Sequence, residues 1–256
     1  MGNPSSDNDR LAGVTHPFMV DHVETEWQFD ADDLSPVEDW LREHPSASGF
    51  AILPEASRGL TDTYYDTEDW RFYRAGYALR VRRAGESVEA TMKSLSPAED
   101  GVRRRREISE PLSSAGPKTL KRARGPVGER LRALVGARDL RPLFEVRTRR
   151  RVFELRPDGP SADSGASVGE VTLDESEFFG HGEGPTRLRR VEVEVGAEPR
   201  DGVSRFVDEL RGSPGLRPAE ASKFELGLSA AGLNPSGVAN LDLKQRTERT
   251  NEKAGG

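Results

Sequence analysis

Segment after segment of this chain alternates between aliphatic and charged residues, and this alternation constrains the fold more than any other feature. In Arg189–Val195, for example, three valines alternate with Arg190, Glu192 and Glu194. Successive side chains of a β-strand point to opposite faces, so each such segment is predicted to be a strand with one aliphatic and one charged face. The segments between them include amphipathic helices, which need an apolar surface to cover.

A closed barrel satisfies both requirements, with the aliphatic faces outside under the helices and the charged faces lining a polar tunnel. About eight strands enclose an interior wide enough for side chains or one small ligand. We therefore expect an α+β fold, an antiparallel β-barrel tunnel of about eight strands with helices packed on the outside. The residues predicted to face the tunnel are Glu24, Glu26, Arg80, Arg82, Lys93, Arg103, Arg105, Glu107, Glu145, Arg147, Arg149, Glu170, Asp174, Arg190, Glu192 and Glu194.

The stretch His22–Phe29 (HVETEWQF) places Glu24, Glu26 and Gln28 on one face of its predicted strand. Two carboxylates side by side on a covered face repel each other unless a cation lies between them. A divalent metal ion suits this position because hard cations bind carboxylate oxygens. A solvated face of an edge strand is the alternative, but the same acidic spacing recurs in the VEVEV segment at residues 191–195, which favours the metal.

So many inward charges remain inside a protein only if they are paired or bound to a ligand. Arginine binds phosphate oxygens through two hydrogen bonds, and a metal ion bridges other phosphate oxygens to carboxylates. A polyphosphate fits the inward-facing basic residues, and Mg²⁺ or Mn²⁺ fits the inward-facing acidic residues.

Composition narrows the class of protein further. The 256 residues include no cysteine, so disulfides and thiolate metal sites are excluded. No apolar run approaches the length of a membrane span, and the N-terminal residues lack a signal-peptide core. The net charge of −6 argues against a surface that coats nucleic acid, although the run Arg103–Arg106 leaves RNA binding, solvation and a substrate role open. We expect a cytoplasmic protein with no membrane or nucleic-acid partner.

One domain is expected between two polar tails. Residues 1–17 and 231–256 are predicted to be disordered, and residues 18–230 to form the domain. The first strand is expected from about residue 20, and Ser35-Pro36-Val37-Glu38 predicts a capping box that opens a helix. Further helices are expected at residues 117–135 and 201–211.

The ordered series of charged motifs resembles the CYTH superfamily, the triphosphate tunnel metalloenzymes, over residues 20–228. The N-terminal EXEXK signature of that family is matched by residues 24–28. Its paired phosphate-binding arginines are matched by Arg80 and Arg82 in YALRVRR. Lys93 matches the lysine of the family's next strand, and Arg147 or Arg149 matches a later basic position. Asp174, Glu192 and Glu194 match the later acidic positions, and Lys223 matches a C-terminal lysine.

The resemblance implies a divalent-metal-dependent triphosphatase, acting on inorganic triphosphate or on a small organic triphosphate such as thiamine triphosphate, with Mg²⁺ or Mn²⁺ as cofactor. The residues implied to be catalytic are Glu24, Glu26, Glu192 and Glu194. Those expected to bind substrate are Arg80, Arg82, Lys93, Arg105, Arg147, Arg149 and Lys223, of which Arg105 is included for its inward strand position and the others for the resemblance. Those implied to hold metal are Glu24, Glu26, Asp174, Glu192 and Glu194.

One position departs from the signature, because Gln28 stands where the family has lysine. Glutamine can bond to a phosphate, but it supplies no positive charge. Two alternatives therefore stay open: a class IV-like adenylyl cyclase, and a polyphosphate- or nucleotide-binding module with weak catalysis. The expected partner is a small anionic triphosphate, and the protein is expected to be a monomer or homodimer.

Overall fold

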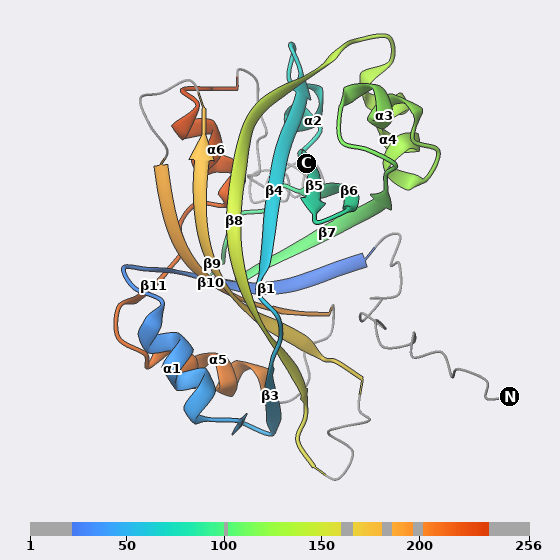
Figure 1. Cartoon of the computed structure of the whole chain (residues 1–256). Coiled ribbons are helices and arrows are strands. Elements are labelled where there is room, and N and C mark those ends of the chain that lie inside the picture. The colour runs from blue at the N-terminus through green and yellow to red at the C-terminus, as the bar shows by residue number, and fades with distance from the viewer. Residues whose placement is uncertain (1–21, 100–101, 160–165, 181–185, 197–201, 236–256) are drawn as a thin grey trace, which may run out of the picture.

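A computed structural model describes residues 22–99, 102–159, 166–180, 186–196 and 202–235 of the chain. The tail predicted over residues 1–17 and most of the tail predicted over 231–256 lie outside the described residues. The strands form an antiparallel sheet in which β8, β4, β5, β6, β7, β1, β10 and β9 are neighbours in that order. Pairing of β8 with β9 closes the ring, so the predicted eight-stranded barrel is confirmed (Figure 1).

The barrel strands are β1 (His22–Ala31), β4 (Arg58–Thr67), β5 (Tyr77–Ala84), β6 (Ser87–Ser94), β7 (Val102–Pro111), β8 (Leu140–Pro157), β9 (Gly169–Phe179) and β10 (Thr186–Val195). Three short strands, β2 (Ser46–Ala47), β3 (Phe50–Pro54) and β11 (Leu216–Pro218), were not predicted. β3 extends the sheet beside β8 and β11 pairs with β1.

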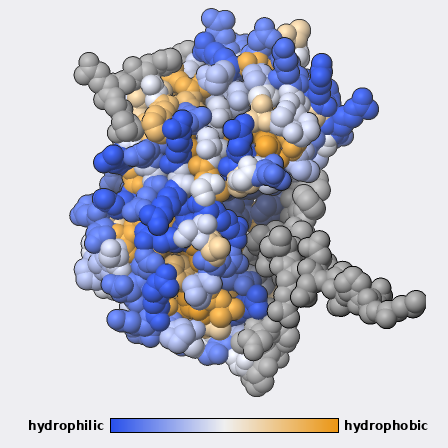
Figure 2. Space-filling view, in the orientation of Figure 1, coloured by the Kyte–Doolittle hydropathy of each residue, from blue (hydrophilic) through white to orange (hydrophobic). Residues whose placement is uncertain are grey.

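Helices cover the aliphatic outer faces, as the alternation predicts. Val171 and Val193 lie in a core with α1 (Ser35–Glu43) and α5 (Val203–Arg211). Val81 lies in a second core with α3 (Pro117–Arg122) and α4 (Pro126–Val135). Hydrophilic residues dominate the face shown in Figure 2, where hydrophobic residues appear only in scattered patches.

One helix departs from the expected arrangement. In α6 (Lys223–Ala230), Phe224 and Leu228 pack on the tunnel-facing side chains Tyr64 and Phe144. The helix therefore closes part of one end of the tunnel instead of covering the outside. α2 (Arg71–Arg74) contributes Phe72 to the core under α3 and α4.

Two local predictions about helix ends were wrong. The predicted capping box at Ser35 does not form: Leu34 is the N-cap residue, and Ser35 bonds the carboxylate of Asp33 instead. The helix predicted over residues 117–135 is two helices, because Pro126 lacks the N–H that would continue the first and suits the first turn of the second. Among the described helices, none is long and apolar enough to cross a membrane.

Candidate active site

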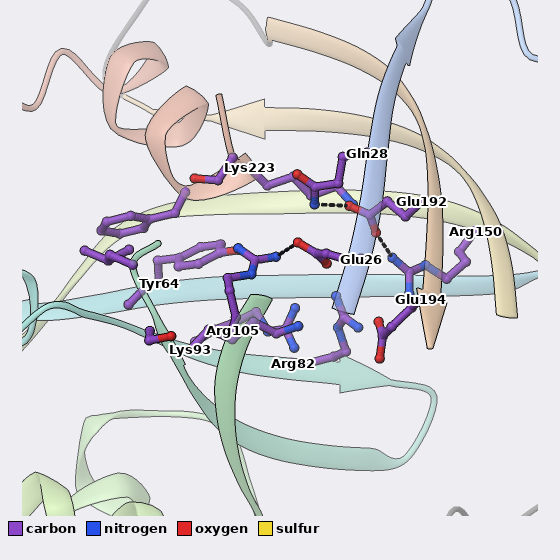
Figure 3. Close-up of a pocket in the computed structure, with 16 residues that line it drawn as sticks. Glu26, Gln28, Tyr64, Arg82, Lys93, Arg105, Arg150, Glu192, Glu194 and Lys223 are labelled. Carbon is purple, nitrogen blue, oxygen red and sulfur yellow. Dashed lines mark hydrogen bonds and ion pairs between the residues drawn. The ribbon is translucent and has the colours of Figure 1, made fainter. Parts of the chain in front are cut away.

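The charged side chains meet in a pocket inside the barrel (Figure 3). Strands on every side of the ring contribute to its wall, and α6 contributes Lys223 and Phe224. The charged and amide residues that line the pocket are Glu26, Gln28, Arg80, Arg82, Lys93, Arg105, Arg150, Glu192, Glu194 and Lys223. The sequence pattern places them there because every second residue of a barrel strand faces the lumen.

A first group of ion pairs joins β1 to its neighbours on one side. Lys93 Nζ lies 2.8 Å from Glu24 Oε1 and 2.5 Å from Glu107 Oε2. Arg105 bonds the carboxylate of Glu26, and its Nε lies 3.6 Å from Glu24 Oε1. The two acids of the N-terminal signature are therefore each in contact with a cation.

A second group surrounds the acids of β9 and β10. Arg150 donates two hydrogen bonds to Asp174, at 2.8 and 2.7 Å, and a third to Glu192 at 3.0 Å. Lys223 Nζ lies 2.5 Å from Asp174 Oδ2 and 3.0 Å from Glu192 Oε1. Gln28 Nε2 also donates to Glu192 Oε1, at 3.0 Å. Both oxygens of Glu192 are thus occupied by donors.

A third group lies between β4 and β5. Arg82 donates two 2.8 Å hydrogen bonds to Asp62, which is almost fully buried. Arg80 is held more loosely: its Nη1 lies 3.8 Å from Asp62, its Nη2 lies 3.5 Å from Thr91 Oγ1, and its buried Nε has no partner among the described residues. Arg80 is therefore the pocket arginine with most donor capacity left for a ligand.

The ion pairs decide the ionisation of the buried acids. Burial alone would raise the pKa of Glu192, but the charges of Lys223 and Arg150 hold that pKa well below its ordinary value. The pKa of Asp62 is lowered in the same way, against its burial, by Arg82 and Arg80. Glu194 is different, because burial and the neighbouring carboxylate of Glu24 raise its pKa well above the ordinary value.

The acids with a carboxylate oxygen free of donors are the ones suited to a metal ion. Among the described residues, Glu24 Oε2 is buried without a hydrogen-bond partner, and Glu194 makes no hydrogen bond or ion pair. Carboxylate oxygens are the donors that Mg²⁺ and Mn²⁺ prefer. Within the described ranges, no three acidic or histidine side chains are gathered closely enough to hold a metal ion in their present positions. The donor chemistry fits a hard divalent cation, and binding one requires these side chains to move together.

Most of the predicted site residues are brought together in the tunnel. These are Glu24, Glu26, Arg80, Arg82, Lys93, Arg105, Asp174, Glu192, Glu194 and Lys223. Arg103 and Arg190 are also buried, and each donates a hydrogen bond to a backbone carbonyl just before α6, at Glu220 and Ala221 respectively. The roles assigned to the site residues remain predictions.

The predicted placement of Arg147 and Arg149 in the tunnel is wrong. Both are exposed, and Arg147 bonds Glu145 on the outer face of β8, so Glu145 was also misplaced. The opposite face of β8 points inward and places Arg150 in the pocket. The prediction assumed that aliphatic residues of a strand lie outside, but the apolar part of the inner face of β8 packs against α6 at the tunnel end.

Sequence reasoning also missed Asp62, Arg150 and the apolar wall formed by Tyr64 and Phe224. Tyr64 stacks on Phe144 with ring centroids 4.7 Å apart, and its ring lies 5.5 Å from that of Phe224. A signal for Asp62 was present, because it stands two residues before Tyr64 in an alternating stretch. Arg150 could be recognised only from its partner Asp174 on the adjacent strand.

The sequence model of the CYTH domain matches residues 37–227. The chain belongs to the CYTH family. The match leaves out β1, so the positions of Glu24, Glu26 and Gln28 in the CYTH tunnel rest on the pairing of β1 between β7 and β10. A comparison with curated proteins finds no match.

Solved structures with the same fold include two that are described as putative cyclases. One, from Hippeastrum, is described as revealing a dominant triphosphatase activity; it has a TM-score of 0.60 and 18% sequence identity, over 86% of this chain and 99% of that chain. The other, from Bacillus halodurans, has a TM-score of 0.50 and 19% identity, over 80% of this chain and 97% of that one. At sequence identities of 18% and 19%, these structures show that this CYTH chain shares their fold.

Proposed function

We propose that this protein is a divalent-metal-dependent triphosphatase that hydrolyses inorganic triphosphate or a small organic triphosphate. The observation that carries the proposal is the convergence of six cationic side chains with several carboxylates in one pocket inside the barrel. Such a pocket suits a ligand that is highly anionic and that brings cations for the acids. The Hippeastrum relative with triphosphatase activity supports the same chemistry.

In this proposal, the cationic side chains bind and orient the phosphate chain. Arg80 has an unoccupied donor, and Lys93 and Arg105 reach the pocket from neighbouring strands. Fixed positive charges lower the barrier by stabilising the charge on the phosphoryl oxygens and by holding the phosphate in line for attack by water. Arg82 lies in a bidentate pair with Asp62, so its role is to fix the geometry of this wall.

Glu24 and Glu194, with Glu26 beside them, are the residues that we propose to hold Mg²⁺ or Mn²⁺. When bound, the metal ion supplies neutralisation of the phosphate charge. Glu192 and Asp174, which the family resemblance also assigns to the metal, are engaged here by Arg150 and Lys223. They are therefore proposed to act chiefly by holding those two cations in place.

A phosphate-release assay on the full chain tests the proposal. Inorganic triphosphate, thiamine triphosphate and ATP should be supplied with Mg²⁺ or Mn²⁺, and at least one should yield orthophosphate only when metal is present. Arg80→Ala should lower kcat/KM by roughly 30-fold or more, because it removes a buried charge-assisted partner of the phosphate. Arg147→Ala, on the outer face, is the matched control and should leave kcat/KM unchanged. Formation of cyclic AMP and pyrophosphate from ATP would instead identify a cyclase.

A further inference from the structure

Gln28 presents an unusual combination of contacts in the pocket wall. The residue is 3% exposed, and its Nε2 donates to Glu192 Oε1 at 3.0 Å. Its carbonyl oxygen Oε1 is buried and has no hydrogen-bond partner among the described residues. Buried carbonyl groups are nearly always paired, so an unpaired one in a ligand pocket points to a donor on the ligand.

A phosphate group is not the partner that this oxygen requires. The ionised oxygens of a triphosphate accept hydrogen bonds and donate none, so they repel an amide oxygen. A lysine at this position would attract phosphate, whereas glutamine with its nitrogen committed to Glu192 turns an acceptor toward the ligand. The group that pairs with this oxygen must therefore carry an O–H or N–H.

A water molecule carried by a divalent cation is one possible donor, but the neighbouring charges disfavour it. Lys223 Nζ contacts the same Glu192 oxygen as Gln28, at 3.0 Å, and Arg150 contacts the other at 3.0 Å. Both oxygens of Glu192 and both oxygens of Asp174 are therefore engaged by these cations and are not free to hold a divalent ion here. A neutral hydroxyl group needs no carboxylate ligand.

The pocket also offers a surface for the organic part of such a ligand. Phe224 and Tyr64 line it together with Leu95 and Ala78, and Phe224 directly follows Lys223 in α6. Inorganic triphosphate has no group that uses an apolar wall. A nucleoside triphosphate has both a ring for this wall and sugar hydroxyls for Gln28.

We propose that Gln28 is a specificity residue whose side-chain carbonyl accepts a hydrogen bond from a hydroxyl of an organic triphosphate. The tunnel then prefers a hydroxyl-bearing organic triphosphate to inorganic triphosphate. This inference rests on the proposed triphosphatase function and names its substrate class.

The test compares ATP, 2′-deoxyATP, 3′-deoxyATP and inorganic triphosphate as substrates of the full chain with Mg²⁺. For the natural sequence, loss of the hydroxyl that bonds Gln28 should lower kcat/KM by about tenfold, the size expected for one buried hydrogen bond whose partner is left unpaired. Gln28→Met has a similar length and no hydrogen-bonding group, so it should turn over ATP and that deoxy analogue equally. Equal kcat/KM for all three nucleotides with the natural sequence would overturn the proposal, as would a preference that survives in Gln28→Met.

Thr172→Val is the matched control. Thr172 lies opposite Glu192 on β9 and is buried, and its hydroxyl has no partner among the described residues, but it does not line the pocket. The variant should keep the full preference for the hydroxyl-bearing nucleotide. If Gln28→Met does not fold, Gln28→Lys serves instead, and it should shift the ratio of kcat/KM toward inorganic triphosphate by roughly tenfold. An unchanged ratio would overturn the proposal.

A binding measurement separates failure of this inference from failure of the proposed function. If no triphosphate yields orthophosphate, the triphosphatase proposal is wrong, and calorimetric titration with ATP and the two deoxy analogues then decides the role of Gln28. An approximately tenfold weaker dissociation constant for one deoxy analogue, abolished in Gln28→Met, supports the inference. Equal dissociation constants overturn it.

Discussion

Arg147 and Arg150 lie three residues apart on β8 but face opposite sides of the barrel wall. The side chain of Arg147 is 62% exposed, whereas that of Arg150 is 11% exposed and bonds both Asp174 and Glu192. Arg150→Met should lower the free energy of unfolding by about 3 kcal/mol, because it leaves two buried carboxylates with Lys223 as their remaining close cation. Urea unfolding measures this change. Arg147→Met should alter the same free energy by less than about 0.5 kcal/mol, and an equal loss in both variants would contradict the assignment.

The buried pair of Asp62 and Arg82 should make stability depend on acid pH. Burial opposes ionisation of Asp62, but Arg82 and Arg80 hold its pKa below the ordinary value of 3.8. The stabilisation is therefore fully present above pH 3.8 and is lost as the pH falls below that value. Asp62→Asn should cost about 3 kcal/mol at pH 7, and the difference from the natural sequence should shrink on acidification.

Urea unfolding across pH 2.5 to 7 measures this dependence, and the exposed Asp39 on α1 provides a control. Asp39→Asn should change the unfolding free energy little at any pH. A constant difference between Asp62→Asn and the natural sequence down to the lowest pH would show that Asp62 does not carry the predicted titration.

At the scale of elements, α6 is the helix that links packing to the site, since its first residue is Lys223. A Cβ atom added at Gly227 would lie 2.0 Å from Phe144 Cε2, and that ring is stacked on Tyr64. Gly227→Ala should therefore destabilise the protein by about 2 kcal/mol, although alanine favours helices by about 1 kcal/mol. It should also lower triphosphate turnover, because the displaced helix moves Lys223.

Thermal unfolding and phosphate release measure the two effects. Ser229→Ala changes an exposed position of the same helix and should leave both unchanged. Normal stability in Gly227→Ala would mean that α6 packs less closely on β8 than the structure indicates.

The barrel could be predicted from the sequence because strand alternation reports directly which residues share a face. In β1 and β10 the aliphatic face is covered by α1 and α5, so charged residues such as Glu24 and Glu192 were assigned correctly to the inside. In β8 the same rule failed. There the inner face includes Phe144 and Val146, which pack on α6, and the sequence of β8 contains no information about that distant helix.

Partners in the tunnel were also beyond sequence reasoning. Asp62 faces Arg82, and Arg150 faces Asp174, only because their strands are neighbours in one register. The alternation within one strand predicts which face of the sheet a residue lies on, but it does not predict which strand is the neighbour. Ser35 and Ser222 are each followed by a glutamate three residues later, but only Ser222 forms a capping box. Ser222 is the N-cap residue of its helix, whereas at α1 the N-cap residue is Leu34.

For the molecule as a whole, the tunnel's opposite charges contact one another. Lys93 bonds Glu24 and Glu107, and the cations of α6 and β8 bond the acids of β9 and β10. In the proposed function, phosphate oxygens would compete with these carboxylates for the cations, and a metal ion would compete with the cations for the carboxylates. Each ligand therefore releases the groups that the other one binds, which predicts positive coupling between the two.

We therefore expect Mg²⁺ and inorganic triphosphate to raise the midpoint of thermal unfolding more together than the sum of their separate effects. Mg²⁺ and triphosphate also bind each other in solution, which lowers the free concentration of each. If the protein bound them at independent sites, the two together would therefore raise the unfolding midpoint by no more than the sum of their separate shifts. A larger shift thus requires coupling in the protein, which we expect to raise each affinity roughly tenfold. Glu24→Gln, which removes one competing charge, should reduce the excess. A combined shift at or below the sum would mean that the tunnel ion pairs need not break when ligands bind.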